Sequence, residues 1–275
     1  MQYNLADLHT HSRCSDGLRT PTEAVQEGIA AGVRVLSLTD HDTVEGIAEA
    51  VEAGRQHSVD VIPGVELSAH VLDREVHLLA YFIDTDSPQL RSHTEILHGL
   101  RHERGAAIVD RLNQLGVPVT MKEVLSRSGN SPLGRPHIAA ALVDHGAVLS
   151  EEEAFVRFIG DRRPAHVPKP RTPADGVIEL IHAVGGVAVL AHPGLSTSDA
   201  ILEKLAWVGL DGIEVYHPSH QPPQIEHYHE VVKHYGLLPS GGSDSHGGSK
   251  GPHIGDCGIG CEAVDALGNR AAAYA

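Results

Sequence analysis

The sequence contains little of what holds secreted or membrane proteins together. It has only three cysteines, Cys14, Cys257 and Cys261, and no Cys-x-x-Cys spacing, so neither a disulfide framework nor a thiolate zinc ribbon is expected. No apolar run approaches the ~20 residues that span a membrane, and the start lacks the basic and apolar regions of a signal peptide. These absences predict a cytoplasmic protein without a membrane partner.

Basic charge is also scarce over most of the chain. The formal net charge is -15, which argues against binding to long duplex nucleic acid. The stretch from residue 101 to residue 171 is different, because it holds 11 of the 21 Lys and Arg but only 8 of the 36 Asp and Glu. A basic stretch in an otherwise acidic chain favours a small anionic ligand.

Short apolar runs alternate with helical patterns, which is typical of repeated βα units and a mainly parallel sheet, either open or closed into a barrel. Helices should begin at Thr20-Pro21-Thr22-Glu23 and at Thr172-Pro173-Ala174-Asp175, where a Thr N-cap precedes a Pro. The expected strands are Tyr3 to Leu8, Val33 to Leu38, Val59 to Val65, Val76 to Ile83, Val187 to Ala191, Gly212 to Tyr216 and Leu237 to Ser240.

The strand pattern disappears between about Ser87 and Pro170, where apolar residues recur at helical spacing. The end of this region, from Arg162 to Arg171, is basic and rich in proline, so it should run extended. We therefore expect a sheet-based domain formed by residues 1–100 and 171–275. A helical, basic insertion of residues 101–170 should interrupt it.

Histidines and carboxylates follow the apolar runs. His9 and His11 lie two apart in a strand, so both rings face the same side and can reach one metal ion. His41 stands between Asp40 and Asp42, which can orient its ring. Imidazole and carboxylate donors without thiolate suit Mn, Zn or Fe. The predicted metal ligands, most of them where a parallel strand would end, are His9, His11, Asp16, His41, Glu66, His77, His192, Asp244 and His246.

These motifs resemble the PHP (polymerase and histidinol phosphatase) family, at both ends of the chain. The segments concerned are Asp7-Leu8-His9-Thr10-His11, Thr39-Asp40-His41-Asp42, Glu66, His77, Ala191-His192-Pro193 and Gly242-Ser243-Asp244-Ser245-His246. The resemblance implies a distorted (β/α)7 TIM-like barrel and a hydrolase of phosphate esters. It implies two or three divalent ions, with Mn as first choice and Zn or Fe as alternatives. One ion would be held by His9, His11, Glu66 and Asp244, a second by Glu66, His77 and His192, and a third by Asp16, His41 and His246.

The insertion resembles that of stand-alone bacterial members described as nucleoside 3′,5′-bisphosphate phosphatases and as 5′-to-3′ exoribonucleases acting on short RNA. This resemblance rests on Gly134-Arg135-Pro136-His137-Ile138-Ala139 and on Pro168-Lys169-Pro170. It implies that the insertion is a substrate lid. The implied reaction removes the 3′-phosphate of a nucleoside 3′,5′-bisphosphate to give the 5′-monophosphate, and short RNA cut from its 5′ end is a further substrate.

In the mechanism expected from such a site, a hydroxide held between two metal ions by Glu66 and its neighbours attacks phosphorus. His217 is the candidate general acid; the alternative is that it only satisfies a carbonyl at a strand end. The candidates for binding a second, non-reacting phosphate are Arg135, His137, Lys169 and Arg171. The alternative for these four is a solvated basic face.

Three other functions remain open on the sequence alone. Histidinol phosphate is the second choice of substrate among the phosphatases. An amidohydrolase that cleaves C–N bonds shares a His-x-His strand and a late Asp. A non-catalytic metal-binding module is the third alternative, and it would lack some ligands, whereas here the set is complete.

Overall fold

The computed structural model describes residues 5–129, 131–195, 197–248 and 251–275. The chain divides into two compact units. Unit 1 comprises Met1–Arg91 and Arg171–Ala275, and unit 2 comprises Ser92–Pro170. The inserted unit thus begins at Ser92, nine residues before the start at residue 101 that the sequence pattern predicts.

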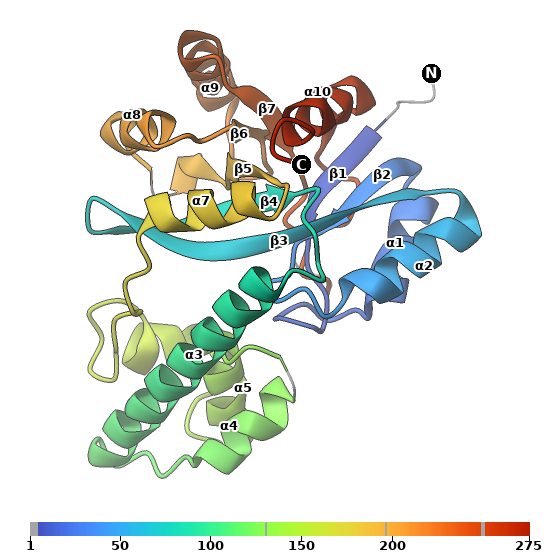
Figure 1. Ribbon diagram of the computed structural model, residues 1–275. Coiled ribbons are helices and arrows are strands. Elements are labelled where there is room, and N and C mark those ends of the chain that lie inside the picture. The colour runs from blue at the N-terminus through green and yellow to red at the C-terminus, as the bar shows by residue number, and fades with distance from the viewer. Residues whose placement is uncertain (1–4, 130, 196, 249–250) are drawn as a thin grey trace. The chain divides into compact units, whose positions relative to one another are not determined.

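Unit 1 is built on a sheet of eight strands in the order β7-β6-β5-β4-β3-β2-β1-β8, with helices around it (Figure 1). The sheet nearly closes on itself, because the segment after β7 pairs with β1: Thr10 bridges Ser245, and Asp244 N donates to His9 O at 2.8 Å. The prediction of a TIM-like α/β barrel is confirmed. The strands are β1 (Leu5–Thr10), β2 (Val33–Leu38), β3 (Asp60–Val71), β4 (Arg74–Tyr81), β5 (Val187–Leu190), β6 (Gly212–Tyr216), β7 (Leu238–Gly241) and β8 (Ile259–Gly260).

The direction of β4 distorts the barrel. Strands β1, β2 and β3 are parallel, as are β5, β6 and β7, but β4 runs antiparallel to both β3 and β5. The beginning of β4 therefore lies at the edge of the sheet where its neighbours end. His77, the fourth residue of β4, reaches the same edge as the histidines that follow the other strands.

The expected strands are close to those observed. Strands β2 and β6 have the predicted bounds. The expected end of the third strand at Val65 is wrong, since β3 continues to Val71 as an antiparallel hairpin with β4. The expected start of the first strand at Tyr3 lies outside the described residues.

One of the two predicted helix starts is correct. Thr20 caps α1 (Pro21–Ala30), and Glu23 closes the capping box. The predicted Thr cap of α7 (Ala174–Ala183) is wrong, because Thr172 pairs with β3 through His70 and the helix begins after Pro173, without a side-chain cap. The other helices of unit 1 are α2 (Ile47–His57), α8 (Asp199–Trp207), α9 (Pro222–Tyr235) and α10 (Cys261–Ala271).

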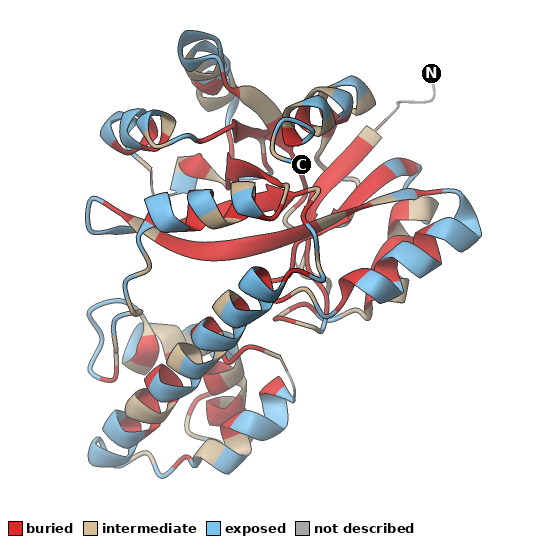
Figure 2. Cartoon of the chain, in the orientation of Figure 1, coloured by how far each residue is buried: buried red, intermediate tan, exposed pale blue. Residues whose placement is uncertain are grey.

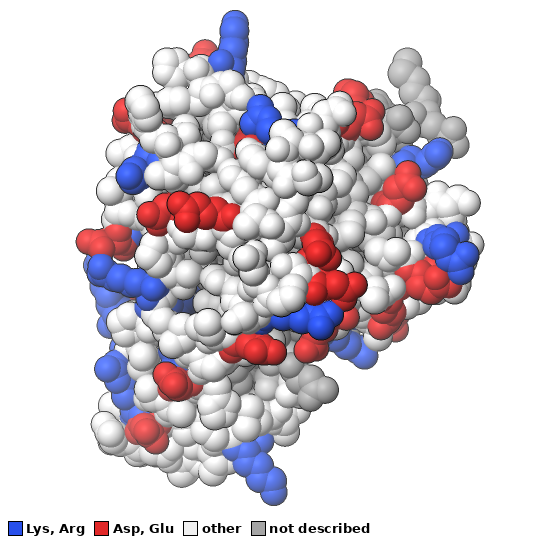
Figure 3. All heavy atoms as spheres, in the orientation of Figure 1, with Lys and Arg blue, Asp and Glu red and all other residues white. Residues whose placement is uncertain are grey.

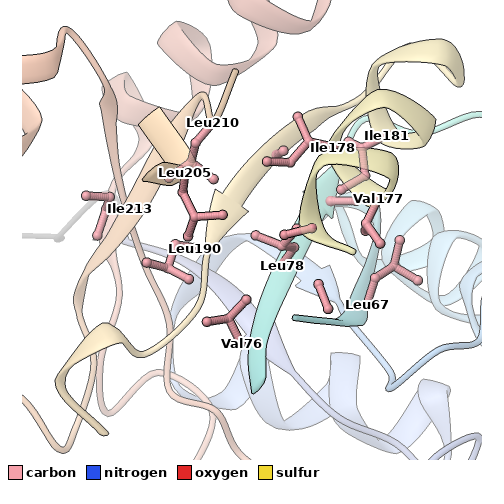
Figure 4. Packing of buried hydrophobic residues seen from close by; sticks show 14 of the residues in the cluster. Leu67, Val76, Leu78, Val177, Ile178, Ile181, Leu190, Leu205, Leu210 and Ile213 are labelled. Atoms are coloured by element: carbon pink, nitrogen blue, oxygen red, sulfur yellow. The ribbon is translucent and has the colours of Figure 1, made fainter. Parts of the chain in front are cut away.

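Most residues of the strands are buried, and each helix around the sheet has buried and exposed residues (Figure 2). In the largest cluster, Val177, Ile178 and Ile181 of α7 pack against Leu67 of β3 and Leu78 of β4 (Figure 4). Each such side chain contributes about 1.5–3 kcal/mol through burial. The strands are therefore held in place by their packing against the helices.

Closure of the barrel requires glycine at position 242. A Cβ there would lie 2.4 Å from both the backbone nitrogen and Cβ of His9. Only glycine lets the segment after β7 approach β1 this closely. The same approach brings Asp244 beside His9.

The C-terminal helix α10 is fastened near the start of β6 through Asp211. This buried carboxylate accepts hydrogen bonds from Tyr274 at 2.8 Å, from Arg270 at 3.1 Å and from Ala188 N at 2.9 Å. It also lies 2.8 Å from His182 Nε2, and the ring of Tyr274 stacks on that imidazole at 3.9 Å. The end of the chain is thus part of the folded barrel.

Unit 2 is helical, as predicted, with its own apolar cluster that includes Ile108, Leu112 and Leu142. The segment after Arg162 is not helical, in agreement with its prolines. None of the helices in the described ranges is both long and apolar enough to cross a membrane. The helices are α3 (Pro88–Gln114), α4 (Met121–Ser128), α5 (Arg135–Asp144) and α6 (Glu151–Ala154), followed by a π-helical turn at Phe155–Ile159.

Candidate metal centre

The structure brings all nine predicted metal ligands together in unit 1. They form four overlapping groups, and in each group the potential ligand atoms lie within 4.8 Å of one another. His9, Glu66 and His77 lie inside β1, β3 and β4, and the other six follow β1, β2, β5 or β7. The groups are His11, Asp16, His41 and His246; His9, His11 and Asp244; His9, Glu66 and His192; and His41, Glu66 and His77.

Glu66 is at the centre of this arrangement. It is fully buried, and its Oε1 lies 2.7 Å from His77 Nδ1 and 3.0 Å from His192 Nε2. Its Oε2 lies within 3.3 Å of a ring nitrogen of His9, of His11 and of His41. A carboxylate that faces five imidazoles with its two oxygens has the geometry of a ligand shared between two metal ions.

A second carboxylate, Asp16, lies with the remaining histidines. Its oxygens are 3.3 Å from His246 Nε2 and 3.9 Å from His41 Nε2. The ring of His246 stacks on that of His11 with their centroids 4.1 Å apart. Asp16 therefore offers an oxygen donor to a group that does not contain Glu66 and that shares only His11 and His41 with the other groups.

The donors fit divalent metal ions better than they fit one another. Within the described part of the chain, both ring nitrogens of His11 and Nδ1 of His41 are buried and make no hydrogen bond. Nε2 of His11 and Nδ1 of His41 do lie within 3.3 Å of carboxylate oxygens, but Nδ1 of His11 has no such neighbour among the described residues, and a buried polar atom without a partner costs about 1–3 kcal/mol. Coordination by a cation would satisfy these nitrogens, and the donor set of imidazole and carboxylate suits Mn, Zn or Fe.

The ionisation states also suit a cation. Burial would raise the pKa of Glu66, but the surrounding imidazoles, those of His77 and His9 among them, hold it well below its ordinary range. Asp244 behaves in the same way through burial opposed by His9 and His11. Burial lowers the pKa of His41 to about 3 despite the nearby carboxylates, so this imidazole is neutral, the form that binds metal.

The backbone is strained at the same place. His192 has a φ of 29° and Asp244 a φ of 52°, and Asp42, which follows His41, has a φ of 53°. Residues with a Cβ rarely adopt such angles, and they persist only where the surrounding structure holds them. Strain that gathers around the predicted ligands is typical of a functional site.

Carboxylates beyond the ligand set hold its loops. Asp7 accepts the backbone N–H groups of Ser243 and Gly255, both at 2.9 Å, and burial raises its pKa to about 6. Asp40 accepts from the backbone and hydroxyl of Ser12 and from the hydroxyl of Ser15. Asp40 was expected to orient His41, but its hydrogen bonds instead hold the loop between His11 and Asp16.

Glu214 was not found from the sequence. It is buried inside β6, with Oε1 2.9 Å from His9 Nδ1 and Oε2 accepting from His192 N at 2.6 Å. Burial opposes its charge, but His9, His217 and His192 lower its pKa. The signal that could have found it is a lone acidic residue between Ile213 and Val215 in an otherwise apolar strand.

His217 lies at the edge of the cluster. Its Nδ1 accepts the backbone N–H of Ser219 at 3.1 Å, so the neutral ring carries its proton on Nε2. That nitrogen lies 3.3 Å from Oδ2 of Asp244. Nε2 of His217 therefore faces Asp244, a predicted metal ligand, and not a carbonyl at a strand end.

The predicted phosphate-binding residues of unit 2 are Arg135, His137 and Lys169. Arg135 is the first residue of α5 and bonds Asp161 at 2.8 Å. His137 Nδ1 accepts the N–H of Gly134 at 3.1 Å, which caps the start of α5. Lys169 lies in the extended segment at the end of the unit. Arg171 belongs to unit 1, where it bonds Asp73 at 2.5 Å on the surface.

Two further arginines of unit 2 were missed. Arg104 donates to Val167 O at 2.8 Å, and Arg111 donates to His166 O. Burial lowers the pKa of His166, and Arg135, Arg104 and Arg111 lower it further, against the opposing charge of Asp161. Three guanidinium groups therefore act on one place in unit 2.

Known proteins resemble this chain over most of its length. The model of the PHP domain matches residues 7–184. The chain is 34% identical over 246 residues to a 5′-3′ exoribonuclease of Haemophilus influenzae, covering 87% of this chain and 89% of the relative. It is 32% identical over 251 residues to a 3′,5′-nucleoside bisphosphate phosphatase of Chromobacterium violaceum, covering 89% and 88%.

A solved structure agrees with both. A protein of Bifidobacterium adolescentis, assigned as a metal-dependent phosphoesterase, superposes with a TM-score of 0.89 at 32% identity, covering 96% of each chain. The non-catalytic alternative is thereby set aside. The chain belongs to the PHP-domain family and is a metal-dependent phosphoesterase.

Proposed function

We propose that this enzyme removes the 3′-phosphate of a nucleoside 3′,5′-bisphosphate and leaves the nucleoside 5′-monophosphate. The observation that carries the proposal is the convergence of nine potential metal ligands, with their imidazoles gathered around the carboxylates of Glu66 and Asp16. We propose that these residues hold two or three divalent ions, with Mn as first choice. Such ions, when bound, polarise a phosphate and lower the pKa of water to near neutrality.

The protein's own residues have separate tasks in this proposal. Glu66 fixes five imidazoles in one orientation and so sets where the phosphate can bind. In its doubly protonated form, His217 donates the Nε2 proton, held next to Asp244, to the departing oxygen of the nucleoside and returns to the neutral ring, with Nδ1–H facing the hydroxyl of Ser219 at 2.7 Å. A positioned general acid contributes about 10²–10⁴ to a rate.

The 5′-phosphate, which does not react, is assigned to unit 2. Arg135, with Arg104 and Arg111, supplies donors and positive charge around His166. Lys169, His137 and Arg171 remain proposed contributors, although His137 also caps a helix and Arg171 pairs with Asp73.

The relatives support a nucleotide substrate. One is named as a nucleoside bisphosphate phosphatase and another as an exoribonuclease, and a bisphosphate resembles the end of a short RNA. We therefore propose short RNA, cut from its 5′ end, as a second substrate. The face shown in Figure 3 mixes acidic and basic side chains, which agrees with a small ligand and not with a long duplex.

The direct test is a comparison of substrates with the enzyme purified in Mn²⁺. Release of phosphate would be measured from a nucleoside 3′,5′-bisphosphate, histidinol phosphate and an aryl phosphate, and C–N cleavage from a panel of amides. We expect the highest kcat/KM with the bisphosphate. A higher value with histidinol phosphate or with an amide would overturn the proposed substrate.

Two variants test the assigned roles. Arg135→Ala should raise KM for the bisphosphate about tenfold or more, the value of one charged hydrogen bond, and leave KM for the aryl phosphate unchanged. Arg127→Ala, which removes an exposed arginine paired with Asp144 in the same unit, is the matched control. His217→Asn should lower kcat and leave the bound metal in place, whereas unchanged kcat would refute the general-acid role.

A further inference from the structure

The carboxylate of Glu214 on β6 contacts two of the proposed metal ligands, His9 and His192, at atoms other than the nitrogens that face Glu66. Glu214 is fully buried, so water does not solvate its carboxylate and protein groups must stabilise the charge. Oε1 lies 2.9 Å from Nδ1 of His9, and Oε2 accepts the backbone N–H of His192 at 2.6 Å. Each oxygen is therefore used by a different strand of the barrel, β1 on one side and the end of β5 on the other.

The first contact determines which nitrogen of His9 faces the cluster. With Nδ1–H donated to Glu214, Nε2 is the nitrogen left to coordinate a cation. That nitrogen is 3.3 Å from Glu66 Oε2 and 3.3 Å from Asp244 Oδ1. A carboxylate behind a coordinating histidine fixes its tautomer and ring orientation and raises its basicity.

The second contact holds the main chain of His192 in a strained conformation. The φ of His192 is 29°, which a residue with a Cβ adopts only when neighbouring groups hold it. The hydrogen bond to Glu214 is such a restraint. The held backbone aims Nε2 of His192 at Glu66 Oε1, 3.0 Å away.

Both contacts converge on the same group of ligands. His9 and His192 reach opposite oxygens of Glu66, and these three residues form one of the four groups of potential ligands. We propose that Glu214 is a positioning residue for the metal centre, which sets how tightly His9 and His192 hold metal without touching an ion itself. The inference rests on the proposed use of these residues as metal ligands.

The substitution Glu214→Gln tests the two hydrogen bonds without changing the volume of the side chain. The amide oxygen can accept from His9 or from His192, but the NH₂ group then faces the other N–H donor. The side chain keeps its size, so the surrounding strands stay filled. One of the two ligands must lose its support.

The chain offers a matched control three residues away. Asp211, just before β6, is also buried, accepts a backbone N–H from Ala188 at 2.9 Å and lies 2.8 Å from a histidine nitrogen, that of His182. It belongs to none of the groups of potential metal ligands in the described residues. Asp211→Asn thus removes an equivalent buried charge away from the centre.

The experiment titrates metal-free wild type, Glu214→Gln and Asp211→Asn with Mn²⁺ and measures the bound ions and their affinities. For Glu214→Gln we expect one ion to bind roughly 10–100-fold more weakly, with the number bound at saturation unchanged. Asp211→Asn should bind every ion as wild type does, although it melts at a lower temperature. Glu214→Asp, which keeps the charge but is one methylene shorter, should weaken the same ion by less and is measured in parallel in case Glu214→Gln does not fold.

Two outcomes would overturn the inference. One is that Glu214→Gln and Glu214→Asp bind all ions with wild-type affinity. The other is that Asp211→Asn weakens metal binding as much as Glu214→Gln, because the effect would then follow from general destabilisation. Failure of wild type to bind any divalent ion would instead overturn the proposed function, and the two failures are told apart by the wild-type titration alone.

Discussion

Binding of Mn²⁺ to the metal-free protein should release protons, because two of the predicted ligands hold protons that a cation must displace. Burial disfavours the charged form of His11, but Asp244 and Glu66 outweigh it and raise its pKa to about 10. His9 is also buried, and Glu214, Asp244 and Glu66 raise its pKa well above the ordinary value. In the absence of metal, these protons balance the carboxylates.

The size of the effect follows from the ligand group that contains both histidines. His9, His11 and Asp244 form one such group, and an imidazole binds metal only in its neutral form. Near pH 7.5 both rings are protonated, so an ion bound by this group displaces two protons. Its apparent affinity should then rise about a hundredfold for each pH unit, tenfold for each proton released.

Isothermal titration calorimetry at pH 7.5, in buffers that differ in ionisation enthalpy, measures the protons released for each ion. We expect about two for the ion of this group. His227→Gln, which removes a histidine on the outer helix α9 that pairs with Asp199, should release the same number as wild type. Metal binding without proton release, or with an affinity independent of pH, would refute the reasoning.

The same shift has a consequence for stability. The folded-state pKa of His11 lies above its ordinary value of 6.5, so its contribution is fully present below that value and is lost as pH rises through about 10. The metal-free protein should therefore lose thermal stability between these pH values. The metal-loaded protein should not, because the ion has replaced the proton.

Three further substitutions have calculable effects. Glu66→Gln should weaken metal binding more than ~100-fold, since this carboxylate contacts five imidazoles; metal analysis after dialysis measures it. Gly242→Ala places a methyl 2.4 Å from His9 and should cost about 1–3 kcal/mol in chemical denaturation. Tyr274→Phe removes the hydroxyl that bonds Asp211 at 2.8 Å and should cost about 1 kcal/mol by the same measurement.

Each of these three substitutions has a control of the same type at a position outside the metal centre and the barrel seam. Glu230→Gln on α9 should retain all bound metal. Gly176→Ala, where a Cβ meets nothing within 4 Å, should not destabilise the protein. Tyr235→Phe at the end of α9 should leave stability unchanged. Retention of metal by Glu66→Gln, or wild-type stability of Gly242→Ala or Tyr274→Phe, would contradict the corresponding contact.

The ligand positions could be predicted because strand ends are easy to find. An apolar run that stops at His or Asp places that side chain at the carboxyl edge of a parallel sheet, and all such edges meet in a barrel. His192, followed by Pro193, and Asp244, after Gly241 and Gly242, are of this kind. Their convergence needs no knowledge of side-chain packing.

The β3–β4 hairpin could not be predicted in the same way. Its turn consists of Leu72 and Asp73, with φ values of 48° and 61°. A two-residue turn with positive φ is normally marked by Asn-Gly or Asp-Gly, and neither occurs here. Without a turn signal, the pattern predicts that β3 ends before Glu66, and it does not indicate that β4 runs antiparallel.

The positions of strand ends do not reveal Glu214 and Asp211, because the role of each depends on a contact with a residue far away in the sequence. Glu214 lies in the interior of β6, and its importance comes from His9, 205 residues earlier in the chain. Asp211 precedes the same strand and bonds Tyr274, 63 residues later in the chain. Such pairs are created by closure of the barrel, and local spacing does not report them.

Charge in the insertion shows a further limit of composition. A count of basic residues treats all arginines alike, but an arginine bonded to a carboxylate loses much of its field, whereas one bonded to a carbonyl does not. Arg127 bonds Asp144, and Arg157 bonds Glu153. Arg104 and Arg111 donate to main-chain oxygens around His166, and their charges lower the pKa of that imidazole. The positive field of unit 2 therefore depends on which acceptor each arginine has, and a count of basic residues does not report it.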